Sequence, residues 1–337
     1  MNANPDQAKQ AASQLPWPMI AILGPTASGK SALGVALAER FGGEILVCDS
    51  TQVYRGFDIG TGKPAVEERR GIPHHLMDVV EPGRRFTAGA YRTNAIAALE
   101  DIRSRARLPI FTVGTGLYFR ALVEGLADAP GRSEKIRLRL ESLAETRGTP
   151  HLHEVLQRLD PAAASRIAPR DRQKLIRAIE VCVLAGRPLT EIHESGRKRL
   201  EGFSLLKIGL QPPRAGLYAR IERRVQTMLD RGWLDEVSSL LRASGSANAK
   251  PFEFIGYREL KAHLEGIVTL EAARKAVTQA TRRYAKRQLT WFRKEPAVHW
   301  LEGFGDDPAI MESAAALVRQ TLASNAAHTA ACGSPNS

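Results

Sequence analysis

The segment GPTASGKS, residues 24–31, constrains the fold of this chain more than any other stretch. It fits the phosphate-loop (P-loop) pattern G-x-x-x-x-G-K-[ST], which is typical of nucleotide-binding and ATP-binding proteins. Gly24 and Gly29 permit backbone angles that turn successive amide N–H groups toward phosphate oxygens. Lys30 supplies a positive charge to the terminal phosphate, and Ser31 offers a hydroxyl to Mg²⁺. The loop therefore predicts a site for two adjacent phosphates with Mg²⁺, but it contains no group that selects a purine or a ribose.

The segments around this loop predict a parallel α/β sheet. Residues 18–23, PMIAIL, form a short apolar run that is typical of a strand buried on both faces. A helical pattern follows the loop, the strand GGEILVCDS ends at Asp49, and a helical pattern over 87–106 leads to a strand that breaks into the turn GTGLY. This order places functional groups at the carboxyl ends of parallel strands. The expected fold is a P-loop NTPase-like parallel sheet core flanked by helices.

The chain changes character after about Leu122. Residues 133–200 are helical in pattern, highly charged and without a good strand, whereas FSLLKIGL at 203–210 resumes strand character. The simplest interpretation is an all-helical insertion domain, residues 123–200, within a catalytic core formed by residues 17–122 and 201–323. The small, polar ends, residues 1–16 and 324–337, are expected to be disordered tails.

The charge of the chain points to a polyanionic partner. There are 48 basic and 36 acidic residues, a net charge of +12, which favours nucleic acid over membrane. Residues 269–294 form the longest helical pattern, and its face opposite the apolar stripe carries Lys275, Arg282, Lys286 and Arg293. Such a basic ridge suits a phosphate backbone, although a merely solvated helix face explains the pattern equally well.

Cysteine usage and hydropathy exclude several classes of protein. Cys48, Cys182 and Cys332 are far apart and no histidine cluster accompanies them, so neither a disulfide framework nor a zinc site is expected. A reducing cytosol fits, and we expect a cytoplasmic protein. No signal-peptide pattern opens the chain, and no stretch reaches the roughly 18 apolar residues of a membrane helix. The absence of a spare apolar helix face favours a monomer without an obligate protein partner.

The residues alone leave the reaction open. A kinase or ATPase normally has an acidic residue at the end of a strand beside the loop strand. The third strand ends in GTGLY without an acid, whereas Asp49 ends the second strand, an arrangement that many small-molecule kinases also use. A kinase of a small metabolite and a nucleic-acid-binding ATPase or switch are therefore both compatible with the loop.

Seven motifs occur in an order that resembles the tRNA dimethylallyltransferases, also called tRNA isopentenyltransferases. They lie between about residues 18 and 302 and read GPTASGKS, DSTQVYRGFDIGTGKP, HHLMD, VGTGLY, QKLIRAIEV, GYRE and TRRYAKRQLTWFR. No C2H2 zinc finger follows the core, so the resemblance is to the bacterial type. One departure is Val113, where the family commonly has glycine, and it changes no catalytic group.

The resemblance implies transfer of a dimethylallyl group from dimethylallyl diphosphate to N6 of adenosine 37 in tRNAs that read codons beginning with U, with release of diphosphate. The expected partners are the tRNA anticodon stem-loop and dimethylallyl diphosphate, and the expected cofactor is Mg²⁺ at Ser31. A related isopentenyltransferase that uses free adenine nucleotides remains an alternative, but a mononucleotide does not need a long basic face.

The resemblance also implies roles for individual residues. Asp49 is the expected general base, Thr115 lies near both substrates, and an arginine, Arg220 first or Arg224 second, accompanies Lys30 in stabilising the leaving diphosphate. Asp49 is also suited to cap the N-terminus of a helix, or to hold a water or side chain that binds Mg²⁺ without binding the ion itself. The diphosphate contacts are expected from Gly24, Pro25, Thr26, Ala27, Ser28, Gly29, Lys30 and Ser31. The tRNA contacts are expected from Asp49, Ser50, Thr51, Gln52, Thr115, Arg137, Gln173, Lys174, Leu175, Ile176 and Arg177, in addition to the basic ridge.

Overall fold

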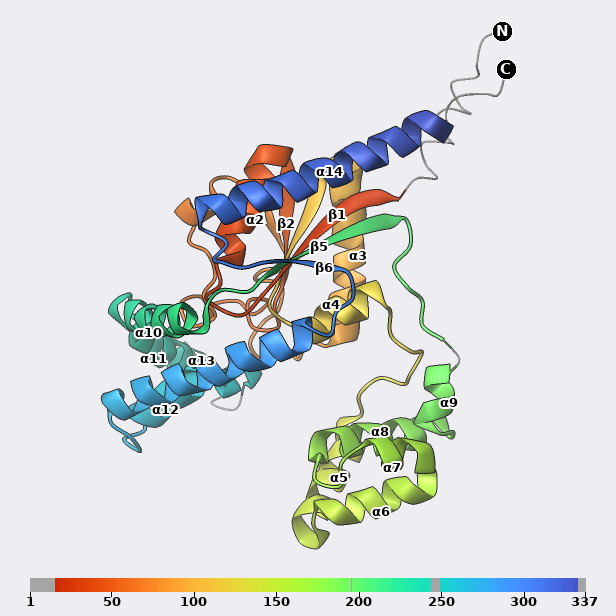
Figure 1. Cartoon of the computed structure of the whole chain (residues 1–337). Coiled ribbons are helices and arrows are strands. Elements are labelled where there is room, and N and C mark those ends of the chain that lie inside the picture. The colour runs from red at the N-terminus through yellow and green to blue at the C-terminus, as the bar shows by residue number, and fades with distance from the viewer. Residues whose placement is uncertain (1–15, 195, 244–248, 333–337) are drawn as a thin grey trace. The chain divides into compact units, whose positions relative to one another are not determined.

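The computed structural model describes residues 16–194, 196–243 and 249–332 (Figure 1). Contacts divide the chain into two compact units, residues 1–122 with 201–337, and residues 123–200. We call the first the core unit and the second the insertion unit. The expected tail at residues 1–16 lies outside the described residues except for its last position.

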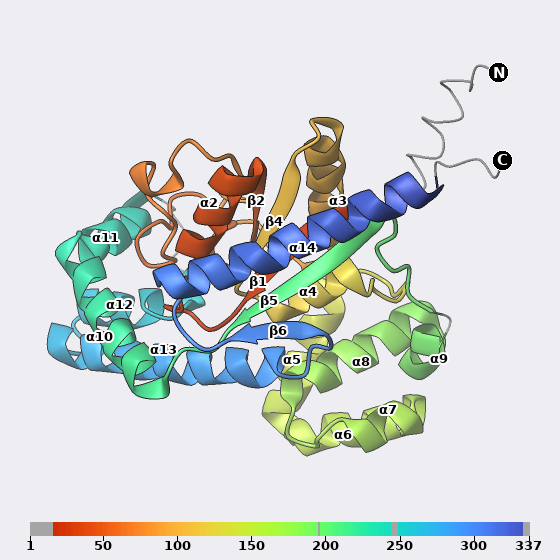
Figure 2. The same ribbon diagram turned by 45° about the horizontal axis from the view of Figure 1, so that its top comes forward.

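The core unit is built on one sheet of six parallel strands in the order β3-β2-β4-β1-β5-β6 (Figure 2). The predicted parallel sheet is thus confirmed, and four of its strands lie where the sequence placed them. The two edge strands β3 and β6 were not predicted, because they are too short for a periodic pattern. The strands are β1 Trp17–Leu23, β2 Gly43–Cys48, β3 His74–His75, β4 Leu108–Val113, β5 Phe203–Leu210 and β6 Val298–Leu301.

The strand order creates a crevice at the carboxyl end of β1. After β1 the chain builds β2, β3 and β4 on one side, and it later adds β5 and β6 on the other side. In open parallel sheets, ligands bind where the strand order reverses, at the carboxyl ends of the strands. The P-loop, Asp49 and the GTGLY turn follow β1, β2 and β4 directly. Topology therefore brings the three predicted motifs to one place.

Helices cover both faces of the sheet. On one face α2 (Lys30–Phe41) and α14 (Pro308–Cys332) pack on alternate strand residues such as Ile20, Ile45 and Ile208. On the other face lie α3 (Ala88–Ser104) and α4 (Gly116–Val123), where the Tyr91 ring stacks on Tyr118 at 4.7 Å. Both faces are buried, which explains why the strands read as continuous apolar runs.

Four helices form a further layer beyond the carboxyl ends of the strands (Figure 1). They are α10 (Arg214–Asp230), α11 (Trp233–Ala243), α12 (Tyr257–Leu264) and α13 (Leu270–Phe292), with the short turns η1 (Glu67–Arg69) and η2 (Lys250–Glu253). Their core joins Trp233, Tyr257 and Val277 to Val53 and Phe57 from the segment after β2. This layer fixes the DSTQ segment against the sheet.

Two of the sequence motifs serve this layer structurally. The Glu236 carboxylate accepts hydrogen bonds from the N–H groups of Asp58 (3.0 Å) and Ile59 (2.7 Å) and from the Tyr257 hydroxyl (2.6 Å). A Cβ atom at Gly60 would overlap the Trp233 indole, and so would one at Gly256. Gly60 of DIGTGKP and Gly256 of GYRE are therefore required by close packing around Trp233.

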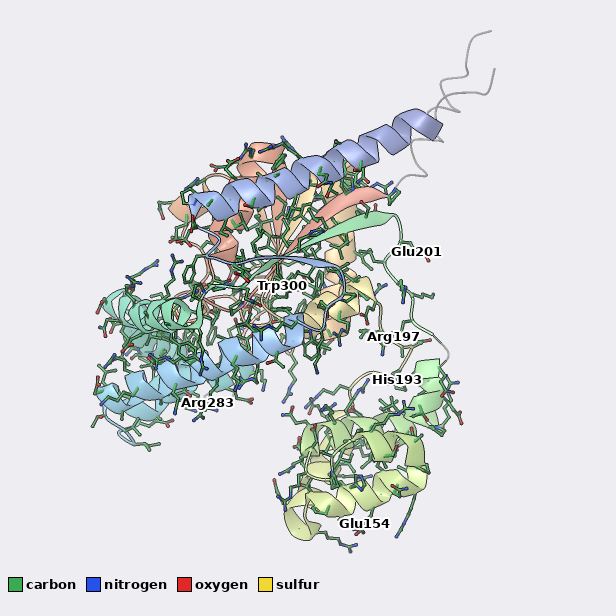
Figure 3. All side chains as sticks on the ribbon, viewed as in Figure 1. Glu154, His193, Arg197, Glu201, Arg283 and Trp300 are labelled. Carbon is green, nitrogen blue, oxygen red and sulfur yellow. The ribbon has the colours of Figure 1, made fainter. Side chains whose placement is uncertain are left out.

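The insertion unit is all-helical, with α5 (Glu134–Arg147), α6 (Thr149–Leu159), α7 (Pro161–Arg166), α8 (Arg172–Ala185) and α9 (Leu189–Glu194). Exposed charged residues such as Glu154 cover α6 on its outer side (Figure 3). Leu175 and Ile176 are fully buried in the core of this unit, together with Leu152 and Leu156. The prediction that Leu175 and Ile176 contact tRNA is therefore wrong, because both are needed for packing.

The expected disordered tail at residues 324–337 is also wrong in part. Helix α14 extends to Cys332, so residues 324–332 continue it, and residues 333–337 lie outside the described residues. No described helix is long and apolar enough to cross a membrane. Cys48 and Cys182, the cysteines whose side chains are described, are buried and unpaired.

A buried carboxylate organises the insertion unit. The Glu180 side chain, 0% exposed, accepts hydrogen bonds from Arg137 Nε (2.9 Å), Arg177 Nη1 (2.8 Å) and Ser133 N (2.8 Å). Arg137 is only 16% exposed and points both of its donors at this carboxylate. The sequence assigned Arg137 and Arg177 to tRNA, but the structure pairs both with Glu180.

We expect Glu180→Gln to destabilise the insertion unit by about 3–5 kcal/mol, because two guanidinium groups lose their counter-charge. Amide hydrogen exchange in α5 and α8 of the whole chain measures this effect. Glu191→Gln, on the exposed side of α9, is the matched control and should leave protection unchanged. Equal protection in the two variants would show that the ion-pair network does not stabilise the unit.

The same network predicts a pH dependence. Burial raises the pKa of Glu180, but the hydrogen bonds from Arg137, Arg177 and Ser133 outweigh burial and lower the pKa from 4.5 to about 2. A carboxylate with a lowered pKa stabilises the folded state fully above its unfolded pKa and loses that effect as the pH falls toward the folded value. Protection of α8 should therefore decline between about pH 4.5 and 2 in the wild type. The Gln variant should show a weaker decline in that window.

Candidate active site

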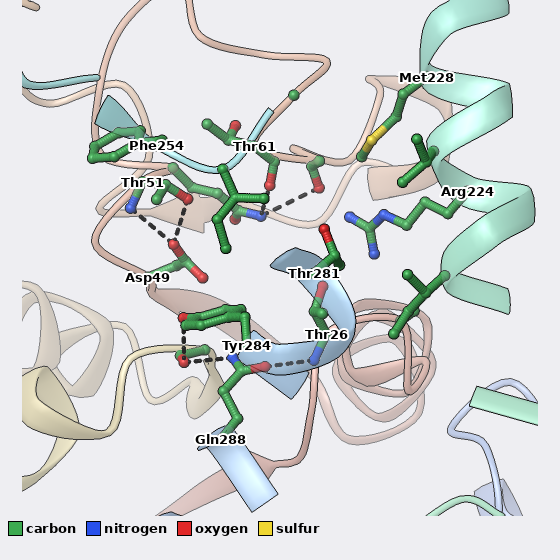
Figure 4. Close-up of a pocket in the computed structure, with 18 of the residues that line it drawn as sticks. Thr26, Asp49, Thr51, Thr61, Arg224, Met228, Phe254, Thr281, Tyr284 and Gln288 are labelled. Carbon is green, nitrogen blue, oxygen red and sulfur yellow. Dashed lines mark hydrogen bonds between the residues drawn. The ribbon is translucent and has the colours of Figure 1, made fainter. Parts of the chain in front are cut away.

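One cavity of about 430 Å³ lies at the carboxyl ends of β1, β2 and β4 (Figure 4). Its walls come from the P-loop, from residues 49–52, from the Gly60–Gly62 turn and from α10 and α13. The structure thus brings together the P-loop, Asp49 and Gln52 as the sequence expected. It adds polar residues of α13, Thr281, Tyr284, Arg287 and Gln288, that the sequence reasoning missed.

The P-loop is shaped to receive an anion. Ala27 and Gly29 adopt positive φ angles of 63° and 88°, which turn the backbone at the loop tip. Helix α2 begins at Lys30, and the N–H groups of a first helical turn have no partner within the helix. The Ser28 hydroxyl is buried and makes no hydrogen bond to any described residue. These unsatisfied donors fit the oxygens of a diphosphate.

Lys30 lies inside this loop. Its ammonium donates to Gly24 O (2.9 Å) and Pro25 O (2.7 Å). Burial lowers the pKa of Lys30 to about 7, the Asp49 carboxylate acts in the opposite direction, and Arg224 adds to the lowering. A bound anion would favour the charged form of Lys30, so a diphosphate in this loop and the Lys30 ammonium would stabilise each other.

Asp49 presents one held and one open carboxylate oxygen. Oδ1 accepts from the Thr51 N–H (2.8 Å) and the Thr51 hydroxyl (2.7 Å). Oδ2 lies against Gly114, where a Cβ atom would overlap it, and no described residue donates a hydrogen bond to it. The first glycine of GTGLY therefore makes room for this carboxylate. An oriented carboxylate with one open oxygen can accept a proton from a ligand in the cavity.

Thr115 and Gln52 hold the neighbouring segments in place. The Thr115 hydroxyl oxygen accepts from Ser50 N (2.9 Å) and lies 3.1 Å from the Ser50 hydroxyl. The Gln52 amide donates to the carbonyls of Thr61 and Gly62, both at 3.2 Å. Thr115 does not line the cavity, so its observed contacts position the DSTQ segment.

The two candidate arginines occupy different environments. Arg220 pairs with Asp306 at 2.6 Å and its guanidinium lies 3.8 Å from the centre of the Phe304 ring. Arg224, one helical turn later on α10, lines the cavity and has no hydrogen-bonded or ion-paired partner among the described residues. Burial lowers the pKa of Arg224, and the Asp49 carboxylate acts against it. A partly buried, unpaired guanidinium beside the P-loop favours Arg224 as the anion ligand.

The apolar stripe expected on α13 differs from the buried face; its spacing in the sequence gives Leu270, Ala273, Val277, Ala280, Tyr284 and Trp291. Leu270 and Trp291 are 38% and 37% exposed, whereas Ala285, Gln288 and Phe292 are buried. The stripe from Val277 therefore continues through Ala285 to Phe292, and it includes a polar residue at its centre. Gln288 could have been found in the sequence as a glutamine on an otherwise apolar face.

The basic ridge on α13 is partly neutralised. Lys275 pairs with Glu271 at 3.4 Å, Arg282 with Glu222 at 3.1 Å, and Arg293 donates to the Gln211 side chain at 3.2 Å. Lys286 is exposed, and no described residue pairs with it. The described residues also provide no acidic partner for three further exposed cations, which are Arg283 (Figure 3) and Arg287 on α13 and Lys294 two residues after its end. These residues form a second strip that the sequence reasoning missed.

The remaining tRNA candidates lie in the insertion unit. Gln173 and Lys174 are exposed on the first turn of α8, and Lys174 pairs with Asp171 at 2.7 Å. Arg177 is 39% exposed beside its ion pair with Glu180. Gln173, Lys174 and Arg177 therefore present a polar surface that a ligand can reach, unlike Leu175 and Ile176.

A second cavity of about 880 Å³ adjoins the outer side of the P-loop. It shares Gly29, Ser31 and Arg224 with the first cavity. Arg223 and Arg231 also line it, and both are exposed without an acidic partner among the described residues. The P-loop is thus bordered by two cavities, and the outer one is rich in arginine.

Comparisons with known proteins agree with the motifs. The family model for IPP transferase matches residues 52–295. The tRNA dimethylallyltransferase of Koribacter versatilis is 50% identical over 301 residues, which cover 89% of this chain and 98% of that protein. That of Geobacter sulfurreducens is 48% identical over 284 residues, covering 84% and 91%.

Solved structures show the same likeness. The full-length tRNA isopentenylpyrophosphate transferase of Bacillus halodurans is 37% identical, with a TM-score of 0.67, and the match covers 93% of this chain and 98% of that one. A eukaryotic dimethylallyltransferase acting on tRNA is 28% identical, with a TM-score of 0.80, and the match covers 91% of this chain and 80% of that one.

Proposed function

The chain belongs to the IPP transferase family of tRNA dimethylallyltransferases, and from this premise we propose that it transfers the dimethylallyl group of dimethylallyl diphosphate to N6 of adenosine 37 in tRNA. The observation that carries the proposal is the shared cavity, in which the P-loop faces the open oxygen of Asp49. An anion site and a base thus border one space. The tRNAs concerned are those that read codons beginning with U, as the resemblance implies.

The carboxylate of Asp49 supplies the base that the reaction needs. The N6 amine of adenine is a poor nucleophile because its lone pair is delocalised into the ring. As N6 forms a bond to the allylic carbon, the carbon–oxygen bond to the diphosphate breaks and Oδ2 of Asp49 takes the N6 proton. Thr51, which holds Oδ1, keeps the carboxylate oriented for this transfer.

The diphosphate leaves with growing negative charge, and the cations of the cavity stabilise it. Lys30 and Arg224 lie on the P-loop side of the cavity, while the Ser28 hydroxyl and the first-turn N–H groups of α2 supply neutral donors. Arg220 is already neutralised by Asp306, so we assign the direct role to Arg224. Arg220 and Thr115 then act by positioning the P-loop and the DSTQ segment.

Mg²⁺ is the cofactor that this site suits. The described residues contain no cluster of three or more His, Cys, Asp or Glu, but Mg²⁺ usually needs few protein ligands when substrate phosphates and water complete its shell. The Ser31 hydroxyl at the start of α2 and the unpaired Ser28 hydroxyl are oxygen donors of the required kind. Bound there, Mg²⁺ would neutralise charge on the diphosphate.

The two cavities suit two substrates of different size. We assign the arginine-rich outer cavity to the approach of dimethylallyl diphosphate, because Arg223, Arg224 and Arg231 attract a small anion. The adenine reaches Asp49 from the other cavity after it leaves its stack in the anticodon loop. Transfer requires no other protein, and we expect a monomer in the cytoplasm.

One assay tests the proposed function. Radiolabelled dimethylallyl diphosphate and Mg²⁺ are incubated with unmodified tRNA carrying A36-A37-A38, or with AMP or ATP instead of tRNA. Label is expected in tRNA without any nucleotide, and a tRNA with A37 replaced by G is the control. Label in AMP alone would favour the isopentenyltransferases of free nucleotides, and consumption of ATP would favour a kinase.

The unpaired cations on α13 and directly after it should set the salt dependence of tRNA binding. Replacing Arg283, Arg287 and Lys294 by Gln is expected to weaken binding of every tRNA, whatever its sequence. The slope of the logarithm of the tRNA binding constant against the logarithm of the salt concentration should become smaller by about one for each lost phosphate contact. The control replaces Lys275, Arg282 and Arg293, whose charges or donors already have partners in the protein. An equal or larger change of the salt slope in the control variant would show that the ridge predicted from the sequence, and not the unpaired cations, binds tRNA.

A further inference from the structure

A buried glutamine of α13 joins the two catalytic loops. Gln288, 6% exposed, accepts a hydrogen bond from the Thr26 N–H of the P-loop at 2.8 Å. Its amide nitrogen donates to Gly114 O, in the turn after β4, at 2.7 Å. The Tyr284 hydroxyl donates to the same carbonyl at 3.2 Å (Figure 4). One side chain thus connects segments that are 262 and 174 residues away from it in the sequence.

Both contacted atoms belong to groups that the reaction uses. Thr26 lies between Gly24 and Ala27 in the loop assigned to the diphosphate. Gly114 lies against the open oxygen of Asp49, so movement of its carbonyl would shift the surface on which that carboxylate rests. Gln288 makes no hydrogen bond to Asp49 or Lys30, and it acts through Thr26 and Gly114. It is a positioning residue by this geometry.

The other side of the same helix carries exposed cations. Arg283 and Lys286 are exposed on α13 and pair with no acidic residue among those described, whereas Tyr284, Arg287 and Gln288 line the cavity. A helix is rigid along its axis, so a ligand that holds the outer strip also holds the residues on the inner face. The described contacts contain no second side chain that hydrogen-bonds both the P-loop and the GTGLY turn.

We propose that Gln288 couples the two substrate sites, so that tRNA bound to α13 raises the affinity of the P-loop for the diphosphate. The inference rests on the proposed function, because it assigns the outer face of α13 to tRNA. Coupling between sites typically amounts to a factor of about 5 to 150, and linkage makes it reciprocal. The side chain has two separable parts, an acceptor for Thr26 and a donor for Gly114.

The test measures the dissociation constant of inorganic pyrophosphate with Mg²⁺, with and without a saturating anticodon stem-loop. In the wild-type chain the stem-loop is expected to tighten pyrophosphate binding at least fivefold. In Gln288→Leu this gain should fall to less than twofold, whereas binding of the stem-loop alone should change less than threefold. Gln279→Leu, the same substitution on the exposed side of α13, should keep the full gain.

A conservative variant separates coupling from a loss of fold. Gln288→Glu retains an acceptor for Thr26 N–H and loses the donor to Gly114 O. We therefore expect it to recover part of the gain in pyrophosphate affinity that Gln288→Leu loses. The melting temperatures of the two variants should be the same. An equal gain in the wild type and Gln288→Leu, or no gain in the wild type, would overturn the inference. Failure of wild-type transfer to tRNA would instead overturn the proposed function, so the two failures are distinguishable.

Discussion

Replacing Asp49 by Asn should lower the rate of dimethylallyl transfer by about 10²- to 10⁴-fold, the range that removal of a general base produces. The amide retains the size of the side chain and can still accept hydrogen bonds from Thr51 through its oxygen. It cannot take the N6 proton. The loss corresponds to about 3–5 kcal/mol in the free energy of the transition state. Single-turnover transfer to tRNA at saturating substrates measures it directly.

The control for this variant is ground-state binding. The Asn variant should bind inorganic pyrophosphate with Mg²⁺ within a few-fold of wild type, since Asp49 is not one of the P-loop donors. Retention of more than about a tenth of the wild-type rate, less than ~1.4 kcal/mol lost, would show that Asp49 is not the base. A helix cap or an outer support of Mg²⁺ would then be its role.

Replacing Arg224 by Gln should lower the transfer rate by about 10²- to 10³-fold, because a preorganised donor to the leaving diphosphate disappears. The affinity for pyrophosphate should fall as well, since the Arg224 guanidinium is expected to pair with the negative charge of this product. The effect should be larger in the rate than in the affinity for tRNA. A comparison of single-turnover rates with tRNA dissociation constants measures that difference.

Arg220→Gln is the matched variant, one turn earlier on the same helix. Its charge is balanced by Asp306 and its guanidinium packs on Phe304, so we expect a loss of about tenfold or less. A greater loss in Arg220→Gln than in Arg224→Gln would reverse the assignment and make Arg220 the diphosphate ligand, the order that the sequence preferred.

Much of the fold was predictable because its signals are local. The buried strands next to the P-loop appear as apolar runs, and the helical segments as periodic patterns with caps such as Thr87 and Thr269. The edge strands β3 and β6 were missed, since two to four residues cannot establish a period. The error at the C-terminal end has a different cause, because small and polar residues, which composition associates with a disordered tail, continue α14 to Cys332.

The site shows where local patterns stop being informative. Leu175 and Ile176 share a motif with Gln173 and Arg177, yet the motif does not tell which of its residues face inward. The prediction that the basic residues from Lys275 to Arg293 lie on one face of a helix followed from their angular spacing. It did not show that Glu222, on another helix, lies close enough to pair with Arg282.

The sequence by itself determined the P-loop, the parallel sheet, the carboxylate at the end of β2 and the family, because each is encoded in residues that are adjacent or regularly spaced. Only the tertiary structure decided that Arg224 rather than Arg220 is unpaired beside the loop. It also decided that Gln288 joins the P-loop to the GTGLY turn. The physical reason is that charge pairing and hydrogen bonding depend on distances between side chains, and the fold sets those distances between residues far apart in the chain.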